Sequence, residues 1–114
     1  MGKKSREKGA AWERECANKL SELTGVECRR NLRQYQVGGS DIESRLPLSV
    51  ECKTGYAIGG HLIGKALQQA ADAAQPNELP LVWIKRNVKG RAPQQYIVMD
   101  EDVLLPVLVT WLRR

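Results

Sequence analysis

The chain has 114 residues, a net charge of +5 and an apolar fraction of 42%, values that are ordinary for one globular domain spanning residues 1–114. No apolar run approaches the ~20 residues of a membrane span, and the basic N-terminus lacks the apolar segment of a signal peptide. We therefore expect an intracellular protein in the cytoplasm. Cys16, Cys28 and Cys52 lie far apart without a CxxC pair, which argues against a zinc site and a disulfide framework.

Positive charge gathers in several separate segments of the chain: "KKSREK" near the start, three arginines at 29–33, "KRNVKGR" at 85–91 and the last two arginines. Such segments are typical of proteins that bind a polyanion, most often nucleic acid, although surface lysines and arginines also serve solubility. The positions that we expect to contact the DNA backbone, without reading bases, are Lys3, Lys4, Arg6, Arg29, Arg30, Arg33, Lys89 and Arg91.

The spacing of Trp12, Cys16, Leu20 and Leu23 predicts an amphipathic helix over residues 5–23, which Gly25 would end. Glu13 shares the apolar stripe with Ala17 and Leu20. A carboxylate on the core side of a helix needs a partner. Glu13 is therefore the acid expected at a functional site, whereas Glu15 points away to solvent.

Residues 26–36 are expected to be extended, and Gly38-Gly39-Ser40 predicts a turn. Residues 41–46 and 48–54 then alternate as strands do, and a tight turn at Leu46-Pro47 would join them as an antiparallel hairpin. Asp41 would fall opposite Glu51 or Cys52. Ser49, Glu51 and Lys53 would share one face, leaving Val50 and Cys52 on the core face.

The second half of the chain predicts a helix over 61–75, strands at 79–85 and 95–99, and a last helix over 101–113 with Asp100 as a plausible N-cap. His61 lies at the start of the helix over 61–75, on its polar side, and is expected at the surface. The order αβββαββα indicates an α/β fold, a mixed β-sheet flanked by helices.

Two carboxylates facing each other on paired strands would repel, and a divalent cation between them would remove that cost. Oxygen ligands with room for water favour Mg²⁺, with Mn²⁺ as an alternative. Such an ion at Asp41 and Glu51 could polarise a phosphate, while Lys53 steadies the developing charge. The competing interpretation is a solvent-exposed hairpin face on which these charges occur by chance.

The sequence resembles the PD-(D/E)XK nuclease superfamily, with Asp41 followed by Glu51-Cys52-Lys53 on the next strand. Within it, "KGAAWERE" at 8–15, "GGSDIE" and "VECKT" are similar to segments of archaeal-type Holliday junction resolvases. That resemblance implies a restriction-endonuclease-like fold, a metal held by Glu13, Asp41 and Glu51, and Lys53 as a catalytic residue. It further implies a homodimer acting on four-way DNA junctions. Ser40 departs from the family's usual serine position, so a turn role is expected for it. Gln69 is a secondary site candidate, since some branches place a glutamine there, and helix-surface polarity is its alternative.

The leading hypothesis is thus a Mg²⁺-dependent endonuclease that resolves Holliday junctions by paired symmetric nicks. The alternatives are a related nuclease for flaps, ends or linear duplex, and a non-catalytic DNA-binding module. For the homodimer face, the candidates are "VLLPVLVTWL" at 103–112 and Trp83, although each could equally be core. No membrane partner is expected, and a phage-encoded protein would work in the host cytoplasm.

Overall fold

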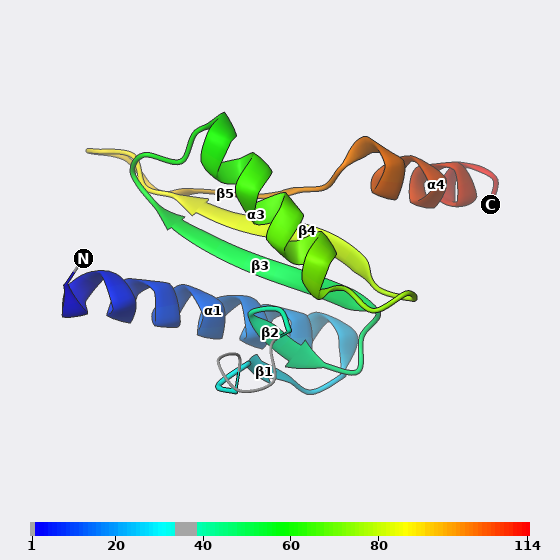
Figure 1. Cartoon of the computed structure of the whole chain (residues 1–114), viewed down its shortest axis with the longest axis horizontal. Coiled ribbons are helices and arrows are strands. Elements are labelled where there is room, and N and C mark those ends of the chain that lie inside the picture. Colours follow the sequence, from blue (N-terminus) through cyan, green and yellow to red (C-terminus); the bar gives the residue numbers. More distant parts are fainter. Residues whose placement is uncertain (1, 34–38) are drawn as a thin grey trace.

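The computed structural model describes residues 2–33 and 39–114, in which helices cover both faces of a small mixed sheet (Figure 1). The order of elements is the predicted αβββαββα. The elements are α1 (Lys3–Thr24), β1 (Cys28–Arg30), β2 (Ile42–Ser44), β3 (Leu48–Gly55), α3 (Gly60–Ala73), β4 (Leu79–Arg86), β5 (Gln94–Val98) and α4 (Glu101–Leu112). Residues 34–36 of the predicted extended segment and Gly38 of the predicted turn lie outside the described residues.

Helix α1 packs on the sheet through the apolar side that its sequence predicts. Trp12 and Cys16 are buried there, and Gly25 ends the helix at φ 73°, donating its N–H to the Ser21 carbonyl. Leu23, predicted on the same side, is instead 81% exposed. The side facing β1 is taken by Ser21, whose hydroxyl accepts the Cys28 N–H at 2.9 Å. Because Leu23 follows two residues later on the helix, it points away from β1.

The predicted hairpin of residues 41–46 with 48–54 is wrong, because the two strands enter different sheets. β2 pairs antiparallel with β1, while β3 pairs parallel with β4, which pairs antiparallel with β5. The parallel ladder runs the full length of β3, from Leu48 opposite Leu79 to Gly55 opposite Arg86. The three-residue β2 could not offer β3 a ladder of that length. The Asp41 N–H, just before β2, donates to the Val50 carbonyl of β3 at 2.9 Å, so the chain touches β3 at this point.

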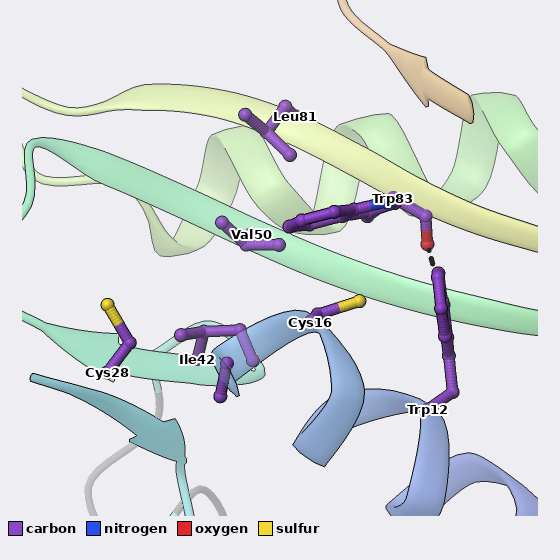
Figure 2. Close-up of a cluster of buried hydrophobic side chains, with 8 residues drawn as sticks. Trp12, Cys16, Cys28, Ile42, Val50, Leu81 and Trp83 are labelled. Carbon is purple, nitrogen blue, oxygen red and sulfur yellow. Dashed lines mark hydrogen bonds between the residues drawn. The ribbon is translucent and has the colours of Figure 1, made fainter. Parts of the chain in front are cut away.

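Alternate residues of the central strand β4 divide the core between two helices. Leu81 and Trp83 pack with Val50 and the buried residues of α1 (Figure 2), whereas Val82 and Ile84 pack with α3 on the other face. The Trp12 indole N–H donates to the Trp83 carbonyl at 3.1 Å, and the two rings meet edge to face at 6.1 Å. This contact ties α1 to the sheet. Trp83 therefore belongs to the core of its own chain.

The two later helices differ in how they are packed. In α3, Ala66 and Ala70 are buried as predicted, and His61 is exposed. In α4 no residue is buried, and Asp100 occupies the N-cap position without a side-chain capping bond. Figure 1 shows α4 standing apart, beyond the segment that follows β5. Across residues 2–33 and 39–114, no helix has both the length and the apolar character needed to cross a membrane.

Candidate active site

Asp41 stands immediately before β2, and its backbone links the two sheets. Its N–H donates to the Val50 carbonyl, and its carbonyl accepts the Asn31 N–H, both at 2.9 Å. Its carboxylate accepts the Cys52 N–H through Oδ2 at 2.7 Å. These three bonds fix the Asp41 carboxylate beside the middle of β3, with only 7% of the residue exposed. Asp41 thus lies next to Cys52, as the sequence predicts, although no hairpin brings it there.

The turn before Asp41 explains the sequence "GGSD". Gly39 adopts φ 98°, a conformation that side chains disfavour, and a Cβ on it would lie 3.1 Å from Asn31 Nδ2. That Asn31 amide donates to the Ser40 carbonyl at 3.0 Å. The Ser40 hydroxyl donates to the Ile42 carbonyl at 3.1 Å, which is the turn role expected for it. Gly39, Ser40 and Asn31 together present Asp41 to β3.

Glu51 is a buried acid on β3, with 6% of the residue exposed. Burial raises the pKa of Glu51 to about 8, assisted by the charge of Asp41 and by a hydrogen bond between the two carboxyl groups. The positive charge of Lys53 lowers the pKa of Glu51, whereas the negative charge of Glu13 raises it. Asp41 and Glu51 therefore form a buried acid pair in which Glu51 keeps its proton to a higher pH than usual, which avoids a second negative charge.

Glu13 lies on α1 and is held by an arginine of β1. Arg30 Nε donates to Glu13 Oε1 at 3.0 Å, and both side chains are largely buried. Burial raises the pKa of Glu13, the bond to Arg30 works against this, and the charge of Asp41 adds to the rise. Glu15 points elsewhere, as predicted, and pairs with Lys85 at 3.1 Å.

Glu13, Asp41, Glu51 and Lys53 come from three separate segments and share one electrostatic environment. Within the described part of the chain, no three Asp, Glu, His or Cys side chains are grouped closely enough to hold one ion, and Glu13 is engaged by Arg30. Asp41 and Glu51 nevertheless fit a hard divalent cation, because both are buried oxygen donors whose mutual repulsion a cation would relieve. Asp41 and Glu51 would hold such an ion. Glu13 would become a third ligand on giving up its hydrogen bond to Arg30.

Two hollows flank α1 beside these residues. Lys53 lines one of about 390 Å³, together with Lys8 and Tyr56. Glu13 lines the other, of about 410 Å³, together with Arg6 and Arg30. Each hollow therefore combines a residue of the candidate site with further basic side chains.

The other predicted DNA contacts lie at the surface, several of them in ion pairs. Arg29 and Arg33 both reach Glu43, at 3.2 and 3.7 Å. Lys3 lies 4.0 Å from Glu7. The remaining candidates are all exposed to solvent: Lys4 and Arg6 on α1, Lys89 and Arg91 between β4 and β5, and the secondary site candidate Gln69 on α3.

Three features of the site were not predicted. The sequence predicts that Arg30 contacts DNA, yet it binds Glu13. Arg30 lies two residues after the buried Cys28 on the same strand, and this spacing could have indicated that both side chains face α1. Ser49 was expected on the open face with Glu51, yet it is fully buried and its hydroxyl donates to the Ala70 carbonyl at 2.7 Å. Nothing in the sequence indicates that Asn31 would hold the turn before Asp41.

Comparison with known protein families identifies the family to which the chain belongs. A family model described as "Phage putative PDDEXK endonuclease" matches residues 4–109, nearly the whole chain. Searches of curated proteins and of solved structures gave no significant match. The family match supports the PD-(D/E)XK superfamily without singling out archaeal-type Holliday junction resolvases. Nucleases of this superfamily generally use divalent metal ions, in keeping with the acid pair beside Lys53. The chain therefore belongs to the phage PDDEXK endonuclease family.

Proposed function

We propose that the chain is a Mg²⁺-dependent, structure-specific endonuclease that cuts branched DNA, with the four-way Holliday junction as its main substrate. The observation that carries the proposal is the buried pair of Asp41 and Glu51, which share hydrogen bonding and repulsion next to Lys53. Burying two acids side by side destabilises the folded chain, so a structural role does not explain the pair. The choice of the junction rests on the resemblance of the helix "KGAAWERE", whose Glu13 lies in the same electrostatic environment.

Each residue has a distinct part in this proposal. A Mg²⁺ or Mn²⁺ ion held by Asp41 and Glu51 would supply Lewis-acid polarisation of the scissile phosphate and a nucleophile at neutral pH. Lys53 lines the hollow beside α1, where its ammonium group would stabilise negative charge developing on the phosphate. Arg30, once released by Glu13, would be free to bind a phosphate in the second hollow.

The basic side chains around the two hollows would hold the sugar-phosphate backbone without reading bases. Paired symmetric nicks in a junction need two active sites, so this function calls for a twofold homodimer.

The test is cleavage of three labelled substrates of the same arm sequence: a four-way junction, a flap and a linear duplex, each with Mg²⁺ and with Ca²⁺. We expect paired symmetric nicks in the junction with Mg²⁺. Asp41→Asn should abolish cleavage while junction binding is retained, because a phosphate is no longer repelled. Glu15→Gln, a matched change on α1 outside the site, should cut like the wild type.

The other outcomes decide between the alternatives. If the flap or the duplex were cut faster than the junction, that DNA, and not the junction, would be the preferred substrate. Tight binding without any cleavage would favour a DNA-binding module. Equal loss of binding, cleavage and thermal stability in Asp41→Asn would make Asp41 a structural residue.

A further inference from the structure

After its acidic first turn, helix α4 is apolar on nearly all sides, and it buries none of its residues against the described part of the chain, residues 2–33 and 39–114. Its segment "VLLPVLVTWL" contains no charged residue, and no residue of the helix is buried. Figure 1 shows the helix standing apart from the sheet and from α1 and α3. Its exposed apolar side chains, each 40–71% exposed, are Leu105, Val107, Leu108, Val109, Trp111 and Leu112.

Such a helix is not stable alone in water. Isolated helices of about a dozen residues are marginal, and most helix stability in proteins comes from packing an apolar face. The six exposed side chains offer on the order of 600 Å² of surface, the upper end of what a monomer leaves uncovered. A partner surface is therefore needed.

A second copy of the chain meets this need in area and in chemistry. If the partner copy covered all six side chains on each helix, on the order of 1,200 Å² would be buried in total, the lower limit for a specific interface. An apolar surface without internal charges is also complementary to itself, which a twofold interface requires.

The charges at the two ends of α4 select the direction of packing. Glu101 and Asp102 lie in its first turn, and Arg113 and Arg114 follow its last turn. The ends are about 18 Å apart, because the helix rises 1.5 Å per residue, and this exceeds the screening length of about 8 Å at physiological salt. Antiparallel packing would set each acidic end against the basic end of the partner, whereas parallel packing would set like charges together.

We propose that α4 packs antiparallel on α4 of a second copy across a twofold axis. This inference stands on the surface and charges of α4 and does not depend on the DNA substrate. Its test is the mass of the full chain in solution, so a failure of the nuclease proposal leaves the result unaffected.

The first experiment is sedimentation equilibrium of the wild type and of Leu108→Lys with Trp111→Lys. We expect a dimer for the wild type and a monomer for the variant. Leu23→Lys, which changes an exposed leucine on α1, is the matched control and should remain dimeric. Apart from the signal lost with the Trp111 side chain, the near-ultraviolet circular dichroism should be unchanged in both variants, because α4 contributes no buried residue to the core that holds the Trp12–Trp83 pair.

The second experiment tests direction by comparing two charge-reversed proteins with the wild type, each alone and then mixed. One carries Glu101→Lys and Asp102→Lys, the other Arg113→Glu and Arg114→Glu. Each should self-associate at least about tenfold more weakly than the wild type, since like charges then meet at both ends of an antiparallel pair. A parallel pair would not weaken, because like charges already meet at both of its ends in the wild type. An equimolar mixture should recover dimers, because in a mixed antiparallel pair opposite charges meet again at both ends.

Three results would overturn the proposal. A monomeric wild type would assign α4 to a different partner, and a dimer that survives Leu108→Lys with Trp111→Lys would place the interface elsewhere. Charge-reversed proteins that each self-associate as tightly as the wild type, or whose mixture stays monomeric while both remain folded, would exclude antiparallel packing.

Discussion

Asp41 and Glu51 bring two acids to a place where even one negative charge is costly. Each is nearly buried, and the Cys52 N–H bonded to Asp41 compensates only part of the charge. Burial and Asp41 together raise the pKa of Glu51 from 4.5 to about 8, with Lys53 opposing the rise. Below about pH 8, a proton on Glu51 therefore reduces the charge of the pair from −2 to −1 when no cation is bound, and a divalent cation would compete with that proton.

The raised pKa of Glu51 predicts how stability depends on pH without divalent ions. A carboxyl group whose pKa is higher in the folded state binds its proton more tightly there than in the unfolded chain. Its contribution is thus fully present below about pH 4.5 and is lost as the pH rises through about 8. We expect the urea midpoint of the wild type in EDTA to fall over this range, and that of Glu51→Gln to fall less.

Mg²⁺ provides the control for this prediction. At pH 8 it should raise the urea midpoint of the wild type and leave that of Glu51→Gln nearly unchanged. Identical pH profiles for the two proteins in EDTA would show that Glu51 does not titrate with a raised pKa in the folded chain.

Lys53 is expected to act in the chemical step and not in holding the ion. Lys53→Ala should lower the single-turnover cleavage rate about 10²–10³-fold, the usual effect of removing one preorganised charge from a transition state. Mg²⁺ affinity, measured by calorimetry, should not weaken, since the change removes a positive charge near the carboxylates. Lys65→Ala on the exposed part of α3 is the matched control. A near-wild-type rate for Lys53→Ala would contradict the role.

Among the secondary-structure elements, periodicity predicted the helices better than the strand partners. The apolar spacing around Trp12 identified α1, because a helix face depends on local sequence alone. The parallel pairing of β3 with β4 depends on the crossover through α3, a contact made across some thirty residues, and alternation along β3 carries no information about it.

The candidate site was likewise predictable only in part. Alternation along β3 put Glu51 and Lys53 together, and the helix stripe selected Glu13. The ion pair of Glu13 with Arg30 and the bond of Asn31 to the turn before Asp41 depend on how β1 and β2 are placed against α1. Such tertiary placement is not encoded in local patterns.

The turn before β2 offers a test of how the fold positions the site. Gly39→Ala should destabilise the chain by about 1–2 kcal/mol, the cost of a side chain in a left-handed conformation, and should lower cleavage because a Cβ would press on Asn31 and shift Asp41. Gly90→Ala is matched, since Gly90 has φ 77° with open space around it. It should lose similar stability and keep its cleavage rate. Equal cleavage rates for Gly39→Ala and Gly90→Ala, measured where both are folded, would show that Gly39 does not help to position Asp41.

At the scale of the whole molecule, the basic residues behind the net charge of +5 lie in several segments of the chain, and some of them lie beside the acid site. Arg6 and Arg30 line one hollow and Lys8 lines the other, while Arg29 and Arg33 are engaged by Glu43. The connection between β4 and β5 extends the basic surface with Lys89 and Arg91. Under the proposed function, such a surface would bind phosphates wherever the DNA backbone passes, and DNA shape would decide where cleavage occurs.

This distribution predicts how binding responds to salt. Each phosphate contact that is lost lowers the slope of log K against log salt concentration by about one. Lys89→Ala with Arg91→Ala should therefore reduce the slope by about two for each bound chain. The ratio of junction to duplex affinity should change little, because two phosphate contacts on this connection would be made to the arm of a junction as well as to a duplex and carry no sequence information. The measurement is fluorescence anisotropy with Asp41→Asn as background, so that no DNA is cut, and with Lys65→Ala on α3 as the matched control. An unchanged slope would show that the β4–β5 connection lies off the DNA path, whereas a collapse of the junction preference would mean that this connection reads DNA shape.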